Sequence, residues 1–254
     1  CADEGLKPLY YGGGTEIVTL ARERKVSPGA VIDIKGVPEC RELRTGGSSL
    51  IFGAGLSLNA VIVSEAFPLM SRVARGIADH TVRNRLSLGG NIAGQLPYRE
   101  TVLPLLLAGA TLHLAAPGAR RELPIGELFS KRLKLETGEL VVQVEVASSL
   151  AGLPWRHLRR EKGTRTDYPI VSLSAMKLEG KIRMAVSGLC NFPFRSSEIE
   201  DVINDKGVSV ESRIAKALTL VPGAVRDDQR ASAEYRSHLF LKGATEIIGE
   251  LEQG

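Results

Sequence analysis

The stretch YYGGGTEI runs from Tyr10 to Ile17, and its three glycines come directly after a short strand predicted at residues 9–11. Three consecutive glycines, Gly12 to Gly14, remove every Cβ from one turn, so successive backbone N–H groups can converge on an anion and approach it closely. Thr15 adds a hydroxyl donor, and the residues after it would form a helix whose N-terminus favours a phosphate. A simple glycine turn fits the same residues, so this stretch alone leaves both interpretations open.

A second glycine stretch, LSLGGNIAG, extends from Leu86 to Gly94. It has a strand-like start, a glycine pair at positions 89 and 90, and the amide of Asn91, which can donate and accept hydrogen bonds. Two such stretches in one domain favour a dinucleotide with two phosphates. The sequence has no G-x-x-x-x-G-K-[ST] pattern, and neither GGGTEI nor GAGLSL at Gly53 has the third glycine of G-x-G-x-x-G. A nucleoside-triphosphate hydrolase and a Rossmann dehydrogenase are therefore disfavoured.

The composition is that of a globular protein, since 43% of the 254 residues are hydrophobic and 24% are charged. This length suffices for one large domain or two smaller ones. The formal net charge is +4, but the 33 basic residues are spread among 29 acidic ones, so nucleic-acid binding is not expected. The longest apolar stretch, Thr101 to Ala116, contains Pro104 and His113 and is shorter than the ~20 residues that span a bilayer, so no membrane helix is expected.

Three widely separated cysteines, Cys1, Cys40 and Cys190, form no C-x-x-C pair. The sequence therefore predicts neither a disulfide framework nor a zinc or iron–sulfur site, and it fits a reducing, cytoplasmic location. The four histidines stand apart without a ligand spacing, and no G-x-S-x-G element is present. No metal site and no catalytic residue is expected in this chain.

Short apolar strands alternate with helices in the first 150 residues. Strands are predicted at residues 9–11, 31–35, 50–55, 110–116 and 138–146, and helices at residues 57–67, 68–78 and 100–110. Between Ala147 and Pro154 the chain becomes small, polar and rich in turns, which predicts a domain boundary.

The residues after this boundary change pattern. VSLSAMKLEGKIRMAVSGL predicts a β-hairpin with its turn at Glu179 and Gly180. Two helices are predicted after it, near residues 210–220 and 231–251, with Ser232 or a neighbour capping the second helix and Ile247, Ile248 and Leu251 facing the core. The sequence thus predicts a two-domain α+β protein with domains at residues 1–150 and 151–254.

A charged cluster, RHLRREKGTRTD, extends from Arg156 to Asp167. It contains Arg159, Arg160 and Arg165. One interpretation is a solvated approach to the hairpin, and the other is a charged wall over a bound anionic cofactor or electron acceptor.

Several segments, in order along the chain, resemble one known family: GGGTEI, VIDIKGVPE, IFGAGLSL, IADHTVRNRLSLGGNIAG and PLLLAGATLHL. Together they resemble the FAD-binding medium subunit of the molybdenum hydroxylases, the xanthine dehydrogenase and carbon monoxide dehydrogenase family. The second half, from Glu161 through RASAEYR at Arg230 to Arg236, is similar to the C-terminal flavoprotein domain of that family. The resemblance implies a vanillyl-alcohol-oxidase (PCMH)-type FAD-binding domain followed by a CO-dehydrogenase flavoprotein C-terminal-like domain.

The resemblance also implies which residues hold FAD. The family's first FAD loop corresponds to Tyr11, Gly12, Gly13, Gly14, Thr15, Glu16 and Ile17, and its second loop to Ser87, Leu88, Gly89, Gly90 and Asn91. Glu100 corresponds to an acid near the ribityl part of the cofactor, Val141 to a backbone contact with the isoalloxazine, and Arg159 to a basic residue near the flavin edge. The family usually has Thr in place of Ser87 and Lys in place of Arg159.

The family's usual N-terminal strand and helix do not precede the first loop here. We interpret the start at Cys1 as truncation in preference to a mature lipoprotein.

In function, the resemblance implies the flavin subunit of a heteromeric molybdenum hydroxylase. The substrate would be oxidised at a molybdopterin centre on a large subunit, and electrons would pass through 2Fe-2S clusters of a small subunit. FAD on the present chain would then pass them to NAD or another acceptor. Two alternatives remain open: a free-standing flavin oxidoreductase of the same fold, and a non-redox nucleotide-binding regulatory subunit.

Overall fold

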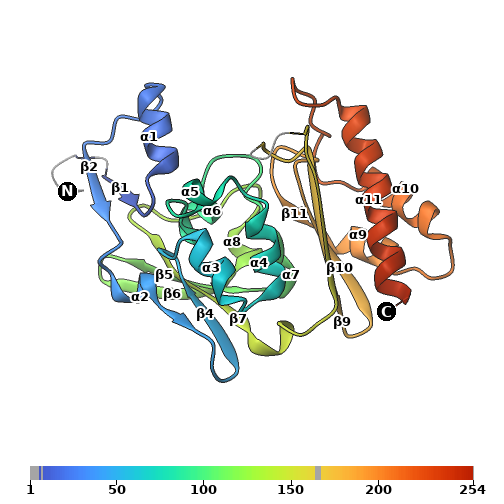
Figure 1. Ribbon diagram of the computed structural model, residues 1–254, viewed down its shortest axis with the longest axis horizontal. Helices are drawn as coiled ribbons and strands as arrows, with labels where there is room; N and C mark the ends of the chain where they lie inside the picture. The colour runs from blue at the N-terminus through green and yellow to red at the C-terminus, as the bar shows by residue number, and fades with distance from the viewer. Residues whose placement is uncertain (1–5, 7, 164–166, 254) are drawn as a thin grey trace.

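Each half of the chain is built on its own antiparallel sheet (Figure 1). The computed structural model describes residues 6, 8–163 and 167–253. Cys1 and Arg165, both singled out from the sequence, lie outside the described residues. The α+β fold class predicted from the sequence is confirmed.

The first sheet has five strands, and the helices of this half pack against it. In spatial order the strands are β3 (Leu43–Arg44), β4 (Ser49–Gly53), β7 (Leu140–Ala147), β5 (Thr111–Ala116) and β6 (Ala119–Pro124). The helices are α2 (Pro38–Arg41), α3 (Leu58–Ser64), α4 (Pro68–Arg75), α5 (His80–Arg83), α6 (Leu88–Ala93), α7 (Val102–Ala108) and α8 (Ile125–Leu128). Leu112 and Leu114 of β5 are buried while their neighbours are partly exposed, as the alternation in the sequence predicts.

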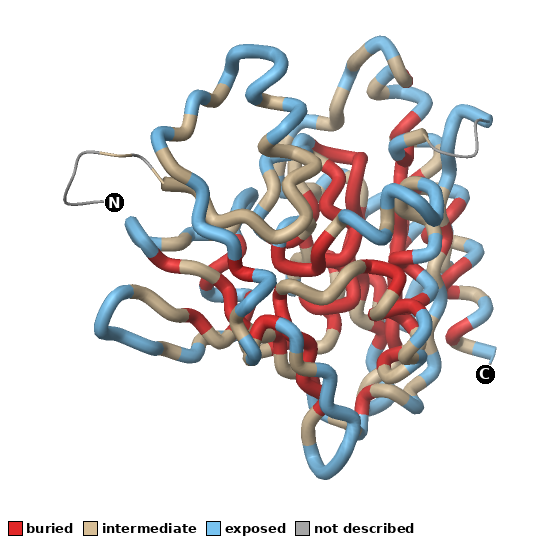
Figure 2. The backbone as a smooth tube through the Cα atoms, turned by 60° about the vertical axis from the view of Figure 1, so that its left-hand side comes forward, coloured by how far each residue is buried: buried red, intermediate tan, exposed pale blue. Residues whose placement is uncertain are grey.

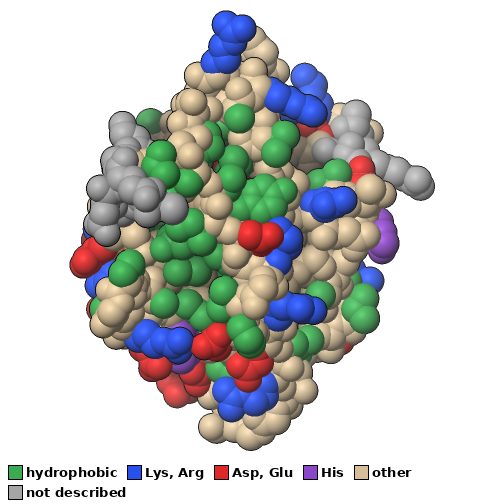
Figure 3. Space-filling model, turned by 90° about the vertical axis from the view of Figure 1, so that its left-hand side faces the viewer, with side chains coloured by type: hydrophobic (Ala, Val, Ile, Leu, Met, Phe, Trp, Pro, Cys, Tyr) green, Lys and Arg blue, Asp and Glu red, His purple; other side chains and the backbone are tan. Residues whose placement is uncertain are grey.

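A small N-terminal unit stands beside this sheet. It consists of β1 (Pro8–Tyr11), α1 (Thr15–Arg22) and β2 (Ala30–Asp33), with β1 and β2 paired in parallel. No residue of α1 is buried, and Figure 2 shows this unit in the tan and pale blue of partly and fully exposed residues. Val18 and Val31 are 44% and 55% exposed, and hydrophobic side chains gather in the middle of the face seen in Figure 3.

The second sheet has four strands and is covered on both faces. Its strands are β11 (Phe194–Arg195), β10 (Lys181–Ser187), β9 (Val171–Leu178) and β8 (Trp155–Arg160). The helices that follow are α9 (Ser197–Ile203), α10 (Val210–Thr219) and α11 (Ala233–Gln253). Helix α11 packs on β8 and β9, and α4 and α7 of the first half pack against the same sheet. Six successive residues of β9, from Val171 to Met176, are therefore buried.

The hairpin and the last two helices agree with the sequence predictions. Glu179 and Gly180 both have positive φ, 51° and 77°, as a two-residue hairpin turn requires. The hydroxyl of Ser232 accepts the N–H of Tyr235 at 3.2 Å, which is the predicted cap. Ile247, Ile248 and Leu251 are buried against the sheet.

A short 3-10 turn, Ser148–Leu150, connects the two sheets. We propose the domain boundary in this connection, since β7 ends at Ala147 and β8 begins at Trp155.

One local prediction is wrong. The strand-like start of LSLGGNIAG is a single bridge between Ser57 and Ser87, and α6 begins at the next residue. The two glycines lie in the first turn of this helix, although glycine disfavours helix. Burial of Leu88 and Ile92 in the core, together with the Ser87 cap, outweighs that intrinsic preference.

Candidate cofactor-binding site

The two glycine stretches meet in the structure. A Cβ added at Gly12 would lie 2.6 Å from the hydroxyl oxygen of Ser87, and one at Gly13 would lie 1.4 Å from the carbonyl oxygen of Arg85. A side chain at Gly12 would displace the Ser87 side chain, and one at Gly13 would force the backbone of the facing segment to move. The glycines therefore allow the first stretch to lie directly on the approach to α6.

The first stretch leaves backbone donors free. Within the described residues, the N–H groups of Gly12 and Gly13 donate to no backbone acceptor outside the regular elements. Gly14 has a φ of 70° and a ψ of 0°, and any Cβ there would overlap the ring of Tyr11. The stretch thus forms a tight turn in which these two N–H groups have no such backbone acceptor among the described residues.

A cleft of about 220 Å³ opens where the two stretches meet. Its lining comes from the first stretch, from the loop after β2 and from the segments that lead into α3 and α6: Tyr11, Gly12, Gly13, Lys35, Gly55, Ser57, Asn84, Arg85 and Ser87. The lining includes two basic side chains and no acidic one.

The remaining residues of the first stretch, Thr15, Glu16 and Ile17, lie in α1. Glu16, in the first turn of α1, accepts the N–H of Gln95 at 2.8 Å and so ties α1 to the segment after α6. Thr15 accepts the hydroxyl of Thr19 through its carbonyl oxygen at 2.9 Å, and Ile17 is half-buried. None of these three residues lines the cleft, and of the three only Glu16 makes a hydrogen bond to another segment.

The second stretch behaves in the same way. Gly89 faces Ala54, where an added Cβ would lie 2.7 Å from the alanine Cβ. The amide oxygen of Asn91 accepts the hydroxyl of Thr101 at 2.6 Å, which joins α6 to the start of α7. Gly90 is exposed, and an added Cβ there would meet only the Ser87 hydroxyl, at 2.8 Å.

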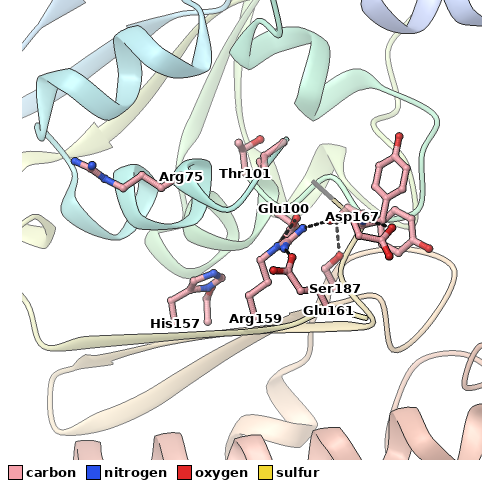
Figure 4. A network of polar contacts seen from close by, with 12 residues as sticks. Arg75, Glu100, Thr101, His157, Arg159, Glu161, Asp167 and Ser187 are labelled. Carbon is pink, nitrogen blue, oxygen red and sulfur yellow. Dashed lines mark hydrogen bonds and ion pairs between the residues drawn. The ribbon is translucent and has the colours of Figure 1, made fainter. Parts of the chain in front are cut away.

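Glu100 and Arg159 meet each other across the two halves of the chain (Figure 4). The Nε of Arg159 donates to both carboxylate oxygens of Glu100 at 3.1 and 3.3 Å. The two side chains are 12% and 4% exposed. Burial raises the pKa of Glu100, and Arg159 and the hydroxyl of Ser172 only partly offset this effect. Glu100, predicted to lie near the ribityl chain, and Arg159, predicted to lie near the flavin edge, thus form one buried ion pair.

The surroundings of Arg159 fix its whole guanidinium. It also pairs with Glu161 and donates to the carbonyl oxygen of Asp167 at 2.6 Å. Beside this network the rings of Tyr98 and Tyr168 stack with centroids 4.8 Å apart. Arg226 lies over the ring of Tyr98 and Arg230 over the ring of Tyr168, each at 5.1 Å from the centroid. This stack spans the two halves a second time, because Tyr98 belongs to the first and the other three residues to the second.

The part of the charged cluster that lies in β8, Arg156 to Arg160, is divided between the two faces of the strand. Arg156 and Arg160 pair with Glu250 and Glu246 of α11, on the face opposite Arg159. His157 shares the face of Arg159 and contacts the hydroxyl of Ser174 at 2.9 Å. Burial, with Arg72 and Arg159 nearby, lowers the pKa of His157 to about 4, so it is neutral at pH 7.

Val141 lies in the middle of the first sheet. It pairs with Leu114 next to an irregularity in the β5–β7 register, and its side chain belongs to the core of the first half.

The sequence analysis did not identify five residues that line the cleft: Lys35, Gly55, Ser57, Asn84 and Arg85. A signal for Ser57 exists, because the tripeptide Leu-Ser-Leu occurs at residues 56–58 and again at residues 86–88. No local pattern marks the two basic residues, since only the fold brings them to one opening.

No helix of the described part of the chain is long and apolar enough to cross a bilayer. The described residues also contain no group of three or more His, Cys, Asp or Glu side chains placed to hold a metal ion.

Comparison with known proteins shows which family the first part of the chain matches and which proteins resemble the chain in sequence. The family model for the FAD binding domain in molybdopterin dehydrogenase matches residues 4–148. The glyceraldehyde dehydrogenase medium chain of Sulfolobus acidocaldarius is 28% identical over 92% of this chain and 86% of its own. The carbon monoxide dehydrogenase medium chain of Hydrogenophaga pseudoflava is 27% identical over 92% of this chain and 85% of its own.

Solved structures share the fold over the whole length. The structure of quinoline 2-oxidoreductase from Pseudomonas putida 86 matches with a TM-score of 0.86 at 24% identity, covering 100% of this chain and 92% of that chain. A carbon monoxide dehydrogenase structure from Hydrogenophaga pseudoflava matches with a TM-score of 0.87 at 24% identity, covering 97% of this chain and 90% of that chain.

Proposed function

We propose that this chain, which belongs to the family of FAD-binding domains of molybdopterin dehydrogenases, is the electron-transfer subunit of its complex. It is a medium subunit of the molybdenum hydroxylase type. The complex would contain a small subunit with 2Fe-2S clusters and a large subunit with molybdopterin. Electrons would leave this chain to NAD or another acceptor, as in a xanthine dehydrogenase-like enzyme. The observation that supports this proposal most is the meeting of two glycine stretches at one cleft, in the half of the chain that matches the family.

The residues at this cleft fit the diphosphate of FAD. The backbone N–H groups of Gly12 and Gly13 have no backbone acceptor outside the regular elements of the described chain, so they can donate to an anion in the cleft. We propose that the stretches 11–17 and 87–91 bind the cofactor, with Gly12, Gly13 and Ser87 in direct contact and the remaining residues as support. When bound, FAD supplies the electron-carrying chemistry, and the protein supplies binding, orientation and electrostatics.

Glu100 and Arg159 are proposed to have a structural role and not to contact the cofactor through a free charge. Because their charges are paired with each other and nearly buried, Arg159 does not present a free positive charge. We propose that the pair fixes the second half of the chain against the first, at the position where the family resemblance places the ribityl and the flavin edge. Val141 would hold the sheet beneath that position through its backbone pairing.

The chain is expected to need its partners for substrate turnover. Expressed alone, it should show at most slow NADH-dependent dye reduction and no hydroxylation of N-heterocycles or aldehydes, because no metal-binding group lies in its described part. Affinity purification from the native source should recover one iron–sulfur subunit and one larger molybdenum subunit. A homo-oligomer of this chain with full substrate turnover would contradict the proposal and favour the free-standing oxidoreductase.

A further inference from the structure

Two Leu-Ser-Leu segments pair with each other at the floor of the cleft. The N–H of Leu58 donates to the carbonyl oxygen of Leu86 at 2.9 Å, and the N–H of Leu88 donates to the carbonyl oxygen of Leu56 at 2.8 Å. This reciprocal pattern places Ser57 directly opposite Ser87 in an isolated antiparallel bridge. The repeated tripeptide of the sequence therefore forms a local two-fold pair in the structure.

The two serines also make the same hydrogen bond. Ser57 accepts the N–H of Ala60 at 3.1 Å, and Ser87 accepts the N–H of Gly90 at 3.2 Å. Both hydroxyl oxygens are thus acceptors, while their O–H protons have no acceptor among the described residues. Since both serines line the cleft, each can donate its proton to a bound anion.

Two basic side chains stand at the same opening. Lys35 follows β2 and lies 4.4 Å from the centroid of the Tyr11 ring, and Arg85 lies between α5 and α6. Lys35 is paired with Asp33 at 2.8 Å, which lowers the pKa of that carboxyl, so its charge is partly compensated. Arg85 forms no ion pair with an acid of the described chain. The opening therefore carries a net positive charge.

We propose that Ser57, Lys35 and Arg85 complete the diphosphate site, with Ser57 binding the FAD diphosphate in the same way as Ser87. This inference rests on the proposed function and adds three residues to the cofactor site. A diphosphate offers only acceptors, and the cleft offers donors of three kinds: backbone amides, serine hydroxyls and basic side chains. The two basic side chains, with no Asp or Glu in the lining, favour the anionic diphosphate over the uncharged ribityl and adenine groups.

The matched test compares two helix-capping serines. Ser57→Ala removes a cap and a cleft hydroxyl, whereas Ser209→Ala removes only a cap, because Ser209 accepts the N–H of Ser212 at the start of α10. In titrations of the flavin-free full chain, Ser57→Ala should bind FAD about tenfold or more weakly, and Ser209→Ala should bind it as the wild type does. Ser57→Thr keeps the hydroxyl and should restore most of the affinity.

ADP and ionic strength serve as further probes. ADP should compete with FAD on the wild type and compete much less well on Ser57→Ala, because both ligands share the diphosphate. Arg85→Gln should weaken FAD binding about fivefold at low ionic strength and flatten its salt dependence, while Arg22→Gln, at the end of α1, should do neither.

The outcomes distinguish a failure of the diphosphate-site inference from a failure of the proposed FAD-binding function. Unchanged FAD affinity in folded Ser57→Ala and Arg85→Gln, with normal binding by the wild type, would overturn the inference and leave the proposed function intact. Equal weakening by Ser57→Ala and Ser209→Ala would also overturn it, because the effect would then come from the cap. A wild-type chain that binds neither FAD nor ADP would instead contradict the proposed function.

Discussion

Gly13→Val is expected to abolish stoichiometric FAD binding while most of the fold remains. A Cβ at position 13 would lie 1.4 Å from the carbonyl oxygen of Arg85, so the first glycine stretch must move away from the segment that leads into α6. That movement opens the cleft and separates the amide donors from the Ser87 hydroxyl. The flavin content of the purified variant and its Kd for added FAD measure the effect, which should exceed about 100-fold in affinity.

The core should tolerate this change, because no residue of α1 is buried. Gly46→Val is the control, since nothing lies within 4 Å of a Cβ at that exposed position and its φ is not in the left-handed region. Gly90→Val should weaken binding less than Gly13→Val, because only the Ser87 hydroxyl must shift. A folded Gly13→Val variant that retains one FAD per chain would show that the two stretches do not form the cofactor site.

Arg159→Met is expected to lower the free energy of unfolding by about 3–5 kcal/mol at neutral pH. The substitution leaves the carboxylate of Glu100 buried without its partner, at 4% exposure, between the two halves of the chain. Urea unfolding followed by circular dichroism measures the loss. Arg156→Gln and Arg160→Gln are matched controls on the other face of β8, and their exposed pairs with α11 should contribute less than about 1 kcal/mol each.

The loss of stability in Arg159→Met should depend on pH, because the ionisation of Glu100 causes it. Burial raises the pKa of this carboxyl in the folded state, so folding is favoured below its ordinary pKa and that stability is lost as the pH rises through the raised value. Removing Arg159 raises the folded pKa further. The defect should therefore be small near pH 4.5 and large at pH 7.5, and Glu100→Gln in the same chain should rescue it at pH 7.5. A defect independent of pH and not rescued by Glu100→Gln would contradict the buried pair.

The sequence predicted those features of the fold that depend on local chemistry. The turn at Glu179 and Gly180 needs positive φ at both positions, and the cap at Ser232 needs only a hydroxyl before a helix. The glycines at positions 12 and 13 predicted a close approach of the backbone to an anion, whereas in the structure the space of their missing Cβ atoms is taken by Ser87 and Arg85. The sequence could not reveal the facing segment, because Arg85 and Ser87 lie more than 70 residues further along the chain.

The same reason explains what was missed at the site. Lys35, Ser57 and Arg85 come from three separate loops, and only the packing of α3 and α6 on the first sheet brings them to one cleft. Arg159 appeared as part of a single basic cluster, but alternation along β8 sends its neighbours to the opposite face. Its pairing with Glu100 joins residues 59 positions apart and could not be read from either segment alone.

The most direct measurement is the flavin content of the purified wild-type chain. We expect a yellow protein with a flavin absorption spectrum, in which the released cofactor is FAD at one molecule per chain, and in which flavin-free protein regains this spectrum on addition of FAD. A folded chain that carries no flavin and does not bind added FAD would contradict the central claim that this protein is an FAD-binding subunit.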